Sequence, residues 1–180
     1  MSSEPSTDDT SPALAHAKRI GKDVEDLALA AVEQLESAPD SQAHHDAETV
    51  ACLTPNAADG LQFGSIAVVE PDTEVDIKAA IRRTDATDCP RGRWFFKGAE
   101  TGQHDALVQS GAMYLLVVYD EDDDGDREIR AMLLVPAAVL DEVLRGRCYE
   151  SGRREGLVSK LTWSALIDPS DLDANGGDKA

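Results

Sequence analysis

Apolar and polar residues alternate along the chain with two different periods, and these periods predict which segments are helices and which are strands. Residues 16–35 carry apolar side chains at spacings of three and four, which is typical of an amphipathic helix. Residues 74–81 alternate between apolar and polar side chains, as in a strand with one buried face. Residues 113–119 form a continuous apolar run with many β-forming residues, which predicts a strand buried on both faces.

Further short elements are expected around these three segments. The pattern predicts strands at residues 48–53, 65–69, 94–96 and 129–135, helices at residues 101–110 and 136–144, and a last short element at residues 161–167. This order indicates a single α/β domain of three layers, in which helices flank a mixed central sheet. Residues 1–11 and 168–180 are polar and are expected to be solvated tails, which places the domain at residues 12–167.

The composition is strongly acidic. The 180 residues include 35 acidic and 17 basic side chains, for a formal net charge of −18. Repulsion of this size destabilises a compact chain at low salt and is screened in concentrated salt. The composition resembles that of halophiles with a KCl-rich cytoplasm, so we expect a halophilic, cytoplasmic protein. No apolar run approaches the length of a membrane span, and residues 1–11 do not resemble a secretory signal.

The few basic residues are gathered in two windows. Residues 79–98 and 143–163 each carry a net charge of +3 and together hold ten of the 17 basic residues. In so acidic a chain, this segregation indicates a surface that contacts an anion. The candidates for phosphate contacts in the first window are Arg82, Arg83, Arg91, Arg93 and Lys97. The alternative is that these side chains pair with the abundant carboxylates of the chain itself.

Candidate chemistry lies on the strand predicted at residues 74–81. Asp76 and Lys78 are two residues apart, so they project from the same face, where unpaired burial of both charges would be costly. A Mg²⁺ ion would remove that cost, because carboxylates bind it and the lysine can hold a phosphate or a water. A hairpin of this strand with the one at residues 65–69 would bring Asp59 close to Asp76. The alternatives are ordinary charges on an exposed strand and a simple turn at Asp59.

These residues, together with Gln103 at the start of the next predicted helix, resemble the PD-(D/E)XK nuclease superfamily. The family includes restriction endonucleases and archaeal Holliday-junction resolvases. The predicted order of elements over residues 14–167 is similar to the α-β-β-β-α-β core of that family. The resemblance implies a restriction endonuclease-like fold and a metal-dependent endonuclease that hydrolyses phosphodiester bonds in DNA, with the five basic residues named above as DNA contacts.

The resemblance also implies a role for each site residue. Asp59 and Asp76 would bind Mg²⁺ or Mn²⁺, with the backbone carbonyl of Ile77 beside them. Lys78 would position the attacking water and offset the charge that develops on the phosphate. Gln103 would orient Lys78 or the water; the alternative is an ordinary polar residue at a helix start.

Two features of the motif are less typical of the family, and two further residues have open roles. Asp59 follows Ala58 rather than Pro, and the acid before x-Lys is Asp rather than the commoner Glu. Glu25 of the first helix would complete the metal site, although an exposed position on an acidic helix explains it equally well. His104 is a candidate general base or a structural residue beside a helix start.

Three functions are compatible with these observations. The first is a Mg²⁺-dependent DNA endonuclease that is resolvase-like or directed to DNA structure, because the chain is short for a site-specific restriction enzyme. By resemblance it would act as a homodimer, since two strands must be cut. The second is a catalytically inactive module of the nuclease fold that binds DNA or protein. The third is a small acidic domain for protein association, in which the acid-x-Lys pattern is a coincidence.

Overall fold

The computed structural model describes residues 12–38, 44–55, 57–58, 60–64, 68–87, 90–98, 102–152 and 156–174. Asp59, residues 1–11 and residues 175–180 therefore lie outside the described residues. The helices are α1 (Pro12–Ala31), α2 (Gln103–Ser110), α3 (Ala137–Leu144), α4 (Pro169–Ala174) and the 3-10 helix η1 (Trp163–Ala165). The strands are β1 (Leu35–Ser37), β2 (Ala47–Thr49), β3 (Leu61–Phe63), β4 (Glu74–Ile81), β5 (Arg93–Lys97), β6 (Met113–Glu121), β7 (Arg127–Pro136), β8 (Tyr149–Glu150) and β9 (Leu157–Thr162).

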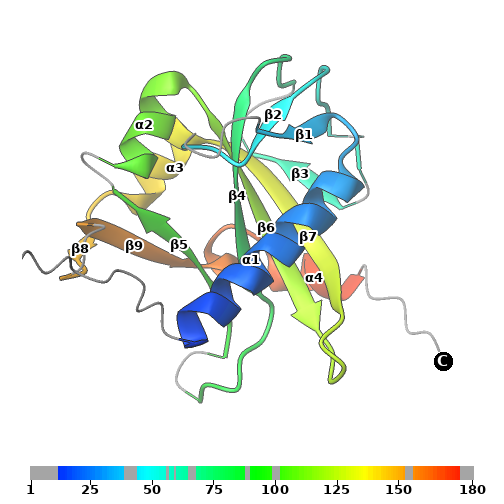
Figure 1. Cartoon of the computed structure of the whole chain (residues 1–180), viewed down its shortest axis with the longest axis vertical. Coiled ribbons are helices and arrows are strands. Elements are labelled where there is room, and N and C mark those ends of the chain that lie inside the picture. Colours follow the sequence, from blue (N-terminus) through cyan, green and yellow to red (C-terminus); the bar gives the residue numbers. More distant parts are fainter. Residues whose placement is uncertain are drawn as a thin grey trace, which may run out of the picture.

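A six-stranded mixed sheet forms the centre of the molecule, with the strand order β1-β2-β4-β6-β7-β3 (Figure 1). β4 and β6 run parallel and are joined by a crossover that contains α2, whereas β1, β2 and β4 pair antiparallel. A smaller sheet of three strands, in the order β5-β9-β8, lies beside the central one. The predicted α/β architecture, a mixed sheet flanked by helices, is confirmed.

The two faces of the central sheet bury separate hydrophobic cores. α1 crosses one face and packs Val24 and Ala28 against Val75 and Ile77 of β4 (Figure 1). The opposite face is covered by α2, α3, α4 and the smaller sheet, whose residues form the second core. Every residue of β6 from Met113 to Tyr119 is buried, as its apolar run predicts. Within the described residues, none of the helices has the length and apolar character that a membrane span needs.

β4 places its acid and its lysine on the face away from α1. The predicted alternation holds, because Val75, Ile77 and Ala79 belong to the core under α1 while Ala80 belongs to the core on the other side. Asp76 and Lys78 share the side of Ala80 and therefore face α2 and the smaller sheet.

The partners of β4 differ from those expected. The predicted hairpin of residues 65–69 with β4 is wrong: β2 pairs with β4, through Ala47 with Val75 and Glu48 with Glu74. β3, the strand that follows residue 59, pairs in parallel with β7 at the far edge of the sheet. In the segment 65–69 itself, Val69 forms an isolated bridge to Leu53, and residues 65–67 lie outside the described ones.

The end of the domain also differs from the expected pattern. The last strand is β9, which ends where the expected short element begins, and η1 follows it. The described part of the expected tail contains α4, because Leu172, only 1% exposed, packs into the core beside Trp163 and Ile167. Burial of one such apolar side chain stabilises a short terminal helix by about 2 kcal/mol.

Candidate active site

The carboxylate of Asp76 is fully buried and has two polar neighbours. Gln103 donates a hydrogen bond from Nε2 to Asp76 Oδ1 at 2.7 Å, and Lys78 Nζ lies 2.6 Å from Asp76 Oδ2. The lysine contact is an ion pair, and beyond it Asp76 Oδ2 has no hydrogen-bond partner among the described residues. The structure brings together the three side chains Asp76, Lys78 and Gln103 that the sequence singled out.

A second carboxylate, that of Asp46, lies beside this group. Asp46 directly precedes β2, and its Oδ2 accepts a hydrogen bond from the backbone N–H of Ile77 at 2.9 Å. The backbone N–H of Asp46 donates to the carbonyl of Val75 at 3.1 Å, so both its main chain and its side chain are fixed on β4. The reasoning from sequence missed Asp46. The only local signal was the short alternation that follows it in Ala47–Thr49, which falls at the end of a polar stretch.

The electrostatics of Asp76 follow from this arrangement. Burial raises the pKa of Asp76 to about 7, because desolvation disfavours the carboxylate form. The charge of Lys78 acts in the opposite direction, and the nearby carboxylate of Asp46 raises the pKa further. A buried carboxylate whose ionisation is hindered by a second carboxylate marks a place where a cation is stabilised.

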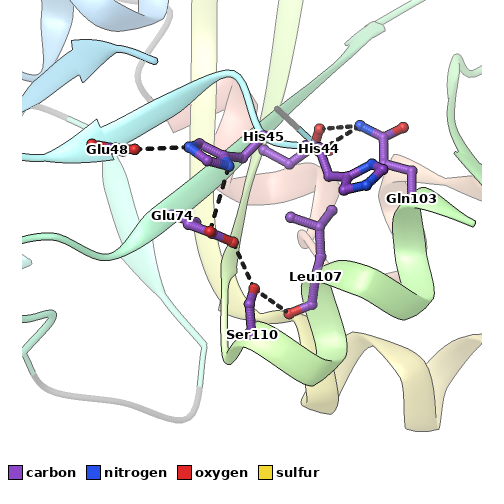
Figure 2. A network of polar contacts seen from close by, with 8 residues as sticks. His44, His45, Glu48, Glu74, Gln103, Leu107 and Ser110 are labelled. Atoms are coloured by element: carbon purple, nitrogen blue, oxygen red, sulfur yellow. Dashed lines mark hydrogen bonds and ion pairs between the residues drawn. The ribbon is translucent and has the colours of Figure 1, made fainter. Parts of the chain in front are cut away.

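The segment that carries Asp46 is tied to the rest of the site from several sides (Figure 2). Gln103 Nε2 also donates to the backbone carbonyl of His44 at 2.9 Å. His45 lies between two glutamates, with Nε2 3.0 Å from Glu48 Oε1 and Nδ1 3.7 Å from Glu74 Oε1. Ser110 of α2 donates to the other oxygen of Glu74 at 2.6 Å. These contacts hold the acidic segment against both β4 and α2.

The start of α2 is set by two glycines in close contact. Gly102 precedes the helix and donates its N–H to the carbonyl of Gly98, which has a φ of 69°. A Cβ on Gly98 would lie 2.4 Å from the Cα of Gly102, so a larger residue would force the two backbones apart. The first residue of α2 is Gln103, and the glycine contact therefore sets where its amide reaches Asp76.

His104, the next residue of α2, is buried and has almost no access to solvent. Its Nδ1 lies 2.9 Å from the hydroxyl of Tyr114 and its Nε2 lies 3.3 Å from Asp141 Oδ1. Burial lowers the pKa of His104, in spite of Asp141, so the ring is neutral at pH 7. A neutral ring satisfies both contacts when the hydroxyl of Tyr114 donates to Nδ1 and Nε2–H donates to Asp141. The geometry supports a structural role, in which His104 links α2, β6 and α3.

We expect His104→Ala to lower the free energy of unfolding by about 2–3 kcal/mol, because it removes a packed ring and leaves the Tyr114 hydroxyl buried without its acceptor. The measurement is denaturant unfolding in about 1 M KCl, where the charge of the chain is screened. His16→Ala, on the exposed surface of α1, is the matched control and should change the free energy by less than about 0.5 kcal/mol. Equal effects of the two substitutions would contradict the structural role.

Glu25 is not brought to Asp76. It lies on α1, over the opposite face of the sheet, where its Oε1 is 2.6 Å from Lys22 Nζ. Asp59 lies outside the described residues, and the hairpin that was expected to carry it to Asp76 is not formed.

The five residues predicted to contact DNA lie in two regions, one after the end of β4 and the other on β5. Arg82 and Arg83 follow the end of β4, where Arg82 Nε is 2.9 Å from Asp120 Oδ1 and both line a cavity of about 360 Å³ together with Arg91. Arg91 also lies over the ring of Trp163 at 5.6 Å. Arg93 and Lys97 are exposed at the two ends of β5. For Arg82, pairing with a carboxylate of the chain is therefore what the structure shows.

The residues at Asp76 fit a divalent metal ion. Apart from its ion pair with Lys78, the buried oxygen Asp76 Oδ2 lacks a partner among the described residues, and the carboxylate of Asp46, just before β2, lies beside it. In the described ranges, no group of three or more His, Cys, Asp or Glu side chains could hold a metal. Two carboxylates completed by waters, backbone carbonyls and substrate phosphates are nonetheless a common environment for Mg²⁺. The donor set is all oxygen, which favours Mg²⁺ or Mn²⁺ over zinc.

Comparison with known proteins agrees with this geometry. The model of the PD-(D/E)XK nuclease superfamily domain matches residues 11–168. A comparison with curated proteins found no match. When β3 at the sheet edge and β5 of the smaller sheet are set aside, the elements α1, β1, β2, β4, α2 and β6 follow the α-β-β-β-α-β order, with Asp76-Ile77-Lys78 on β4. Asp46 directly precedes β2, the antiparallel neighbour of β4, and Gln103 begins α2. The chain belongs to the PD-(D/E)XK nuclease superfamily.

Proposed function

We propose that the chain is a metal-dependent endonuclease that hydrolyses phosphodiester bonds in DNA. One observation carries the proposal: the fully buried carboxylate of Asp76, which is paired with Lys78 at 2.6 Å, has the second carboxylate of Asp46 beside it. A structural ion pair alone would not place a second negative charge against the first, because the two carboxylates repel each other. Family membership supports the same conclusion.

The residues of the site would have two kinds of role: some bind the metal and others position the water, the phosphate or the carboxylates. Asp46 and Asp76 would hold Mg²⁺ or Mn²⁺, with the backbone carbonyl of Ile77 as the third protein ligand that the family pattern implies. The bound metal supplies a polarised phosphate and a water of lowered pKa. Lys78 is partly exposed and can donate hydrogen bonds to the attacking water or to a phosphate oxygen. Gln103 fixes Asp76 and the loop of His44 in place.

The proposal extends to the DNA substrate, the oligomeric state and the location of the protein. Resolvase-like or structure-directed cleavage is proposed from the resemblance to the archaeal Holliday-junction resolvases of the superfamily. A homodimer is expected because both strands of a duplex must be cut. Location in a cytoplasm rich in KCl is expected from the acidic composition alone.

The function is tested by cleavage of labelled single-stranded, duplex and four-way-junction DNA in about 1 M KCl with Mg²⁺, Mn²⁺ or EDTA. We expect metal-dependent cutting that Lys78→Ala lowers by about a hundredfold to a thousandfold, because the charge on the phosphate loses its positive neighbour. Lys18→Ala, on the exposed part of α1, is the matched control and should cut at the rate of the wild type. Binding of DNA without cutting, by a folded wild-type protein, would support an inactive module instead.

A further inference from the structure

The outer face of the small β5–β9 sheet gathers cations around an aromatic ring. Along β5, Trp94 and Phe96 point into the core and are 0% and 2% exposed, whereas Arg93, Phe95 and Lys97 alternate with them and face outward. The register sets Phe95 opposite Lys160 of β9. Arg93, Lys97 and Lys160 are all exposed, while Phe95 is half-buried.

The two lysines lie close to the ring. Lys97 Nζ is 5.9 Å and Lys160 Nζ is 5.7 Å from the centroid of Phe95, within the range of cation–π contacts. Cations around an exposed edge of an aromatic ring match the chemistry of a nucleic-acid strand, which offers phosphates to the cations and a base to the ring.

A cavity lies between this face and the strand that carries Asp76. β2 pairs with β4 only at Glu74 and Val75, so the edge of β4 beyond Val75 is not covered by β2. The cavity has a volume of about 410 Å³, and its walls include residues 79–81 of β4 together with Arg93, Phe95 and Lys160. Figure 1 shows β5 and β9 beside β4 on this side of the sheet.

We propose that this face binds an unpaired strand of DNA, with a base stacked on Phe95 and phosphates held by Arg93, Lys97 and Lys160. From this face, the DNA strand would pass along the cavity beside β4 towards Asp76. The step to Asp76 rests on the proposed nuclease function, whereas binding at Phe95 does not. An unpaired strand is favoured over a duplex because the bases of a duplex are stacked on each other and cannot reach a ring on a flat sheet.

The test measures binding of a fluorescein-labelled oligothymidylate, and of a duplex of equal length, by anisotropy in EDTA. We expect Phe95→Leu to weaken binding of the single strand about tenfold, the range for loss of one stacked base, and to change duplex binding less than about twofold. Phe95→Tyr keeps a ring and should bind like the wild type. Lys160→Gln should lower the salt dependence of single-strand binding by about one phosphate contact, while Lys18→Gln on α1 should not.

Equal effects of Phe95→Leu on both DNAs, or no effect on the single strand, would overturn the proposal. If Phe95→Leu does not fold, the loss of salt dependence in Lys160→Gln decides the question. Because EDTA removes any divalent metal, binding is measured apart from cutting. If the protein binds an unpaired strand through Phe95 but does not cut DNA, this inference holds and the proposed nuclease function fails. If the protein cuts DNA and Phe95→Leu binds the single strand normally, the nuclease function holds and this inference fails.

Discussion

Replacement of Asp46 by Asn should abolish metal-dependent DNA cleavage, with a loss on the order of a thousandfold in kcat/KM. The substitution removes one of the two negative charges that would hold the metal, and an amide oxygen is a much weaker ligand for Mg²⁺ than a carboxylate. The fold should persist, because the amide oxygen can still accept the hydrogen bond that Ile77 N–H now donates to Asp46 Oδ2 at 2.9 Å. The measurement is single-turnover cleavage of the preferred DNA with unfolding curves run in parallel.

Two matched variants make the Asp46 prediction specific. Asp59→Asn tests the acid that the sequence first suggested and should retain activity within about twofold if Asp46 is the carboxylate that holds the metal with Asp76. Glu48→Gln removes an acid of β2 that contacts His45 and is 40% exposed, and this variant should also remain active. Loss of cleavage in Asp59→Asn together with normal cleavage in Asp46→Asn would return the metal site to the residue first suggested by the sequence.

The local part of the site was predictable because strand periodicity is a property of adjacent residues. The alternation in β4 alone places Asp76 and Lys78 on one face, and the long apolar run of β6 identifies the buried strand next to it. A single crossover helix between two parallel neighbours then brings its first residue, Gln103, to the same face. Each of these steps depends on a few residues that are close in the sequence.

Asp46 was missed because its strand is defined by a distant partner. β2 has only three residues, too few for a periodic pattern, and it exists because Ala47 pairs with Val75. The preceding residues are polar, so the segment resembles a loop when only its own composition is considered. The same limit explains the misplaced hairpin: the sequence near β4 does not determine which strand pairs with it, and in the structure that strand is β2 rather than residues 65–69.

The positions of the basic residues were predictable from the sequence, but their partners in the fold were not. A basic window marks a surface that can contact an anion, but it does not say which arginines are already engaged. The structure pairs Arg82 with Asp120, and Arg130 shares the same carboxylate at 2.8 Å. Arg93 instead faces outward on the same side of β5 as Phe95. This arrangement is evident only once Trp94 and Phe96 are known to face the core.

Asp76→Asn should make the metal-free protein more stable while it abolishes cleavage. The pKa of Asp76 is about 7 in the folded protein and about 4 in the unfolded chain. Below about pH 4 both states hold the proton, and stability falls as the pH rises towards 7, because the unfolded chain releases the proton more readily. Above pH 7 the ionised, buried carboxylate lowers the free energy of unfolding by about 2–4 kcal/mol. Asn resembles the protonated acid and avoids this loss.

The pH dependence separates this effect from ordinary repacking. In EDTA and about 1 M KCl, the stability advantage of Asp76→Asn over the wild type should grow by about 2 kcal/mol between about pH 5.5 and pH 8. Lys78, Asp46 and Tyr114 face the site in both proteins, so the difference between the curves isolates Asp76. Asp123→Asn, in an exposed turn, should stay within about 0.5 kcal/mol of the wild type at both values.

Mg²⁺ should narrow the stability difference between the two proteins, because a ligand that binds only the folded state stabilises it in proportion to its occupancy. Added Mg²⁺ should raise the free energy of unfolding of the wild type by about 2–3 kcal/mol at a hundred times its dissociation constant, and should leave Asp76→Asn nearly unchanged. An advantage of Asp76→Asn that is independent of pH, or an equal response of both proteins to Mg²⁺, would mean that Asp76 is a structural acid. A buried carboxylate that destabilises the empty site and is stabilised only by a cation is instead what a metal-dependent active site requires.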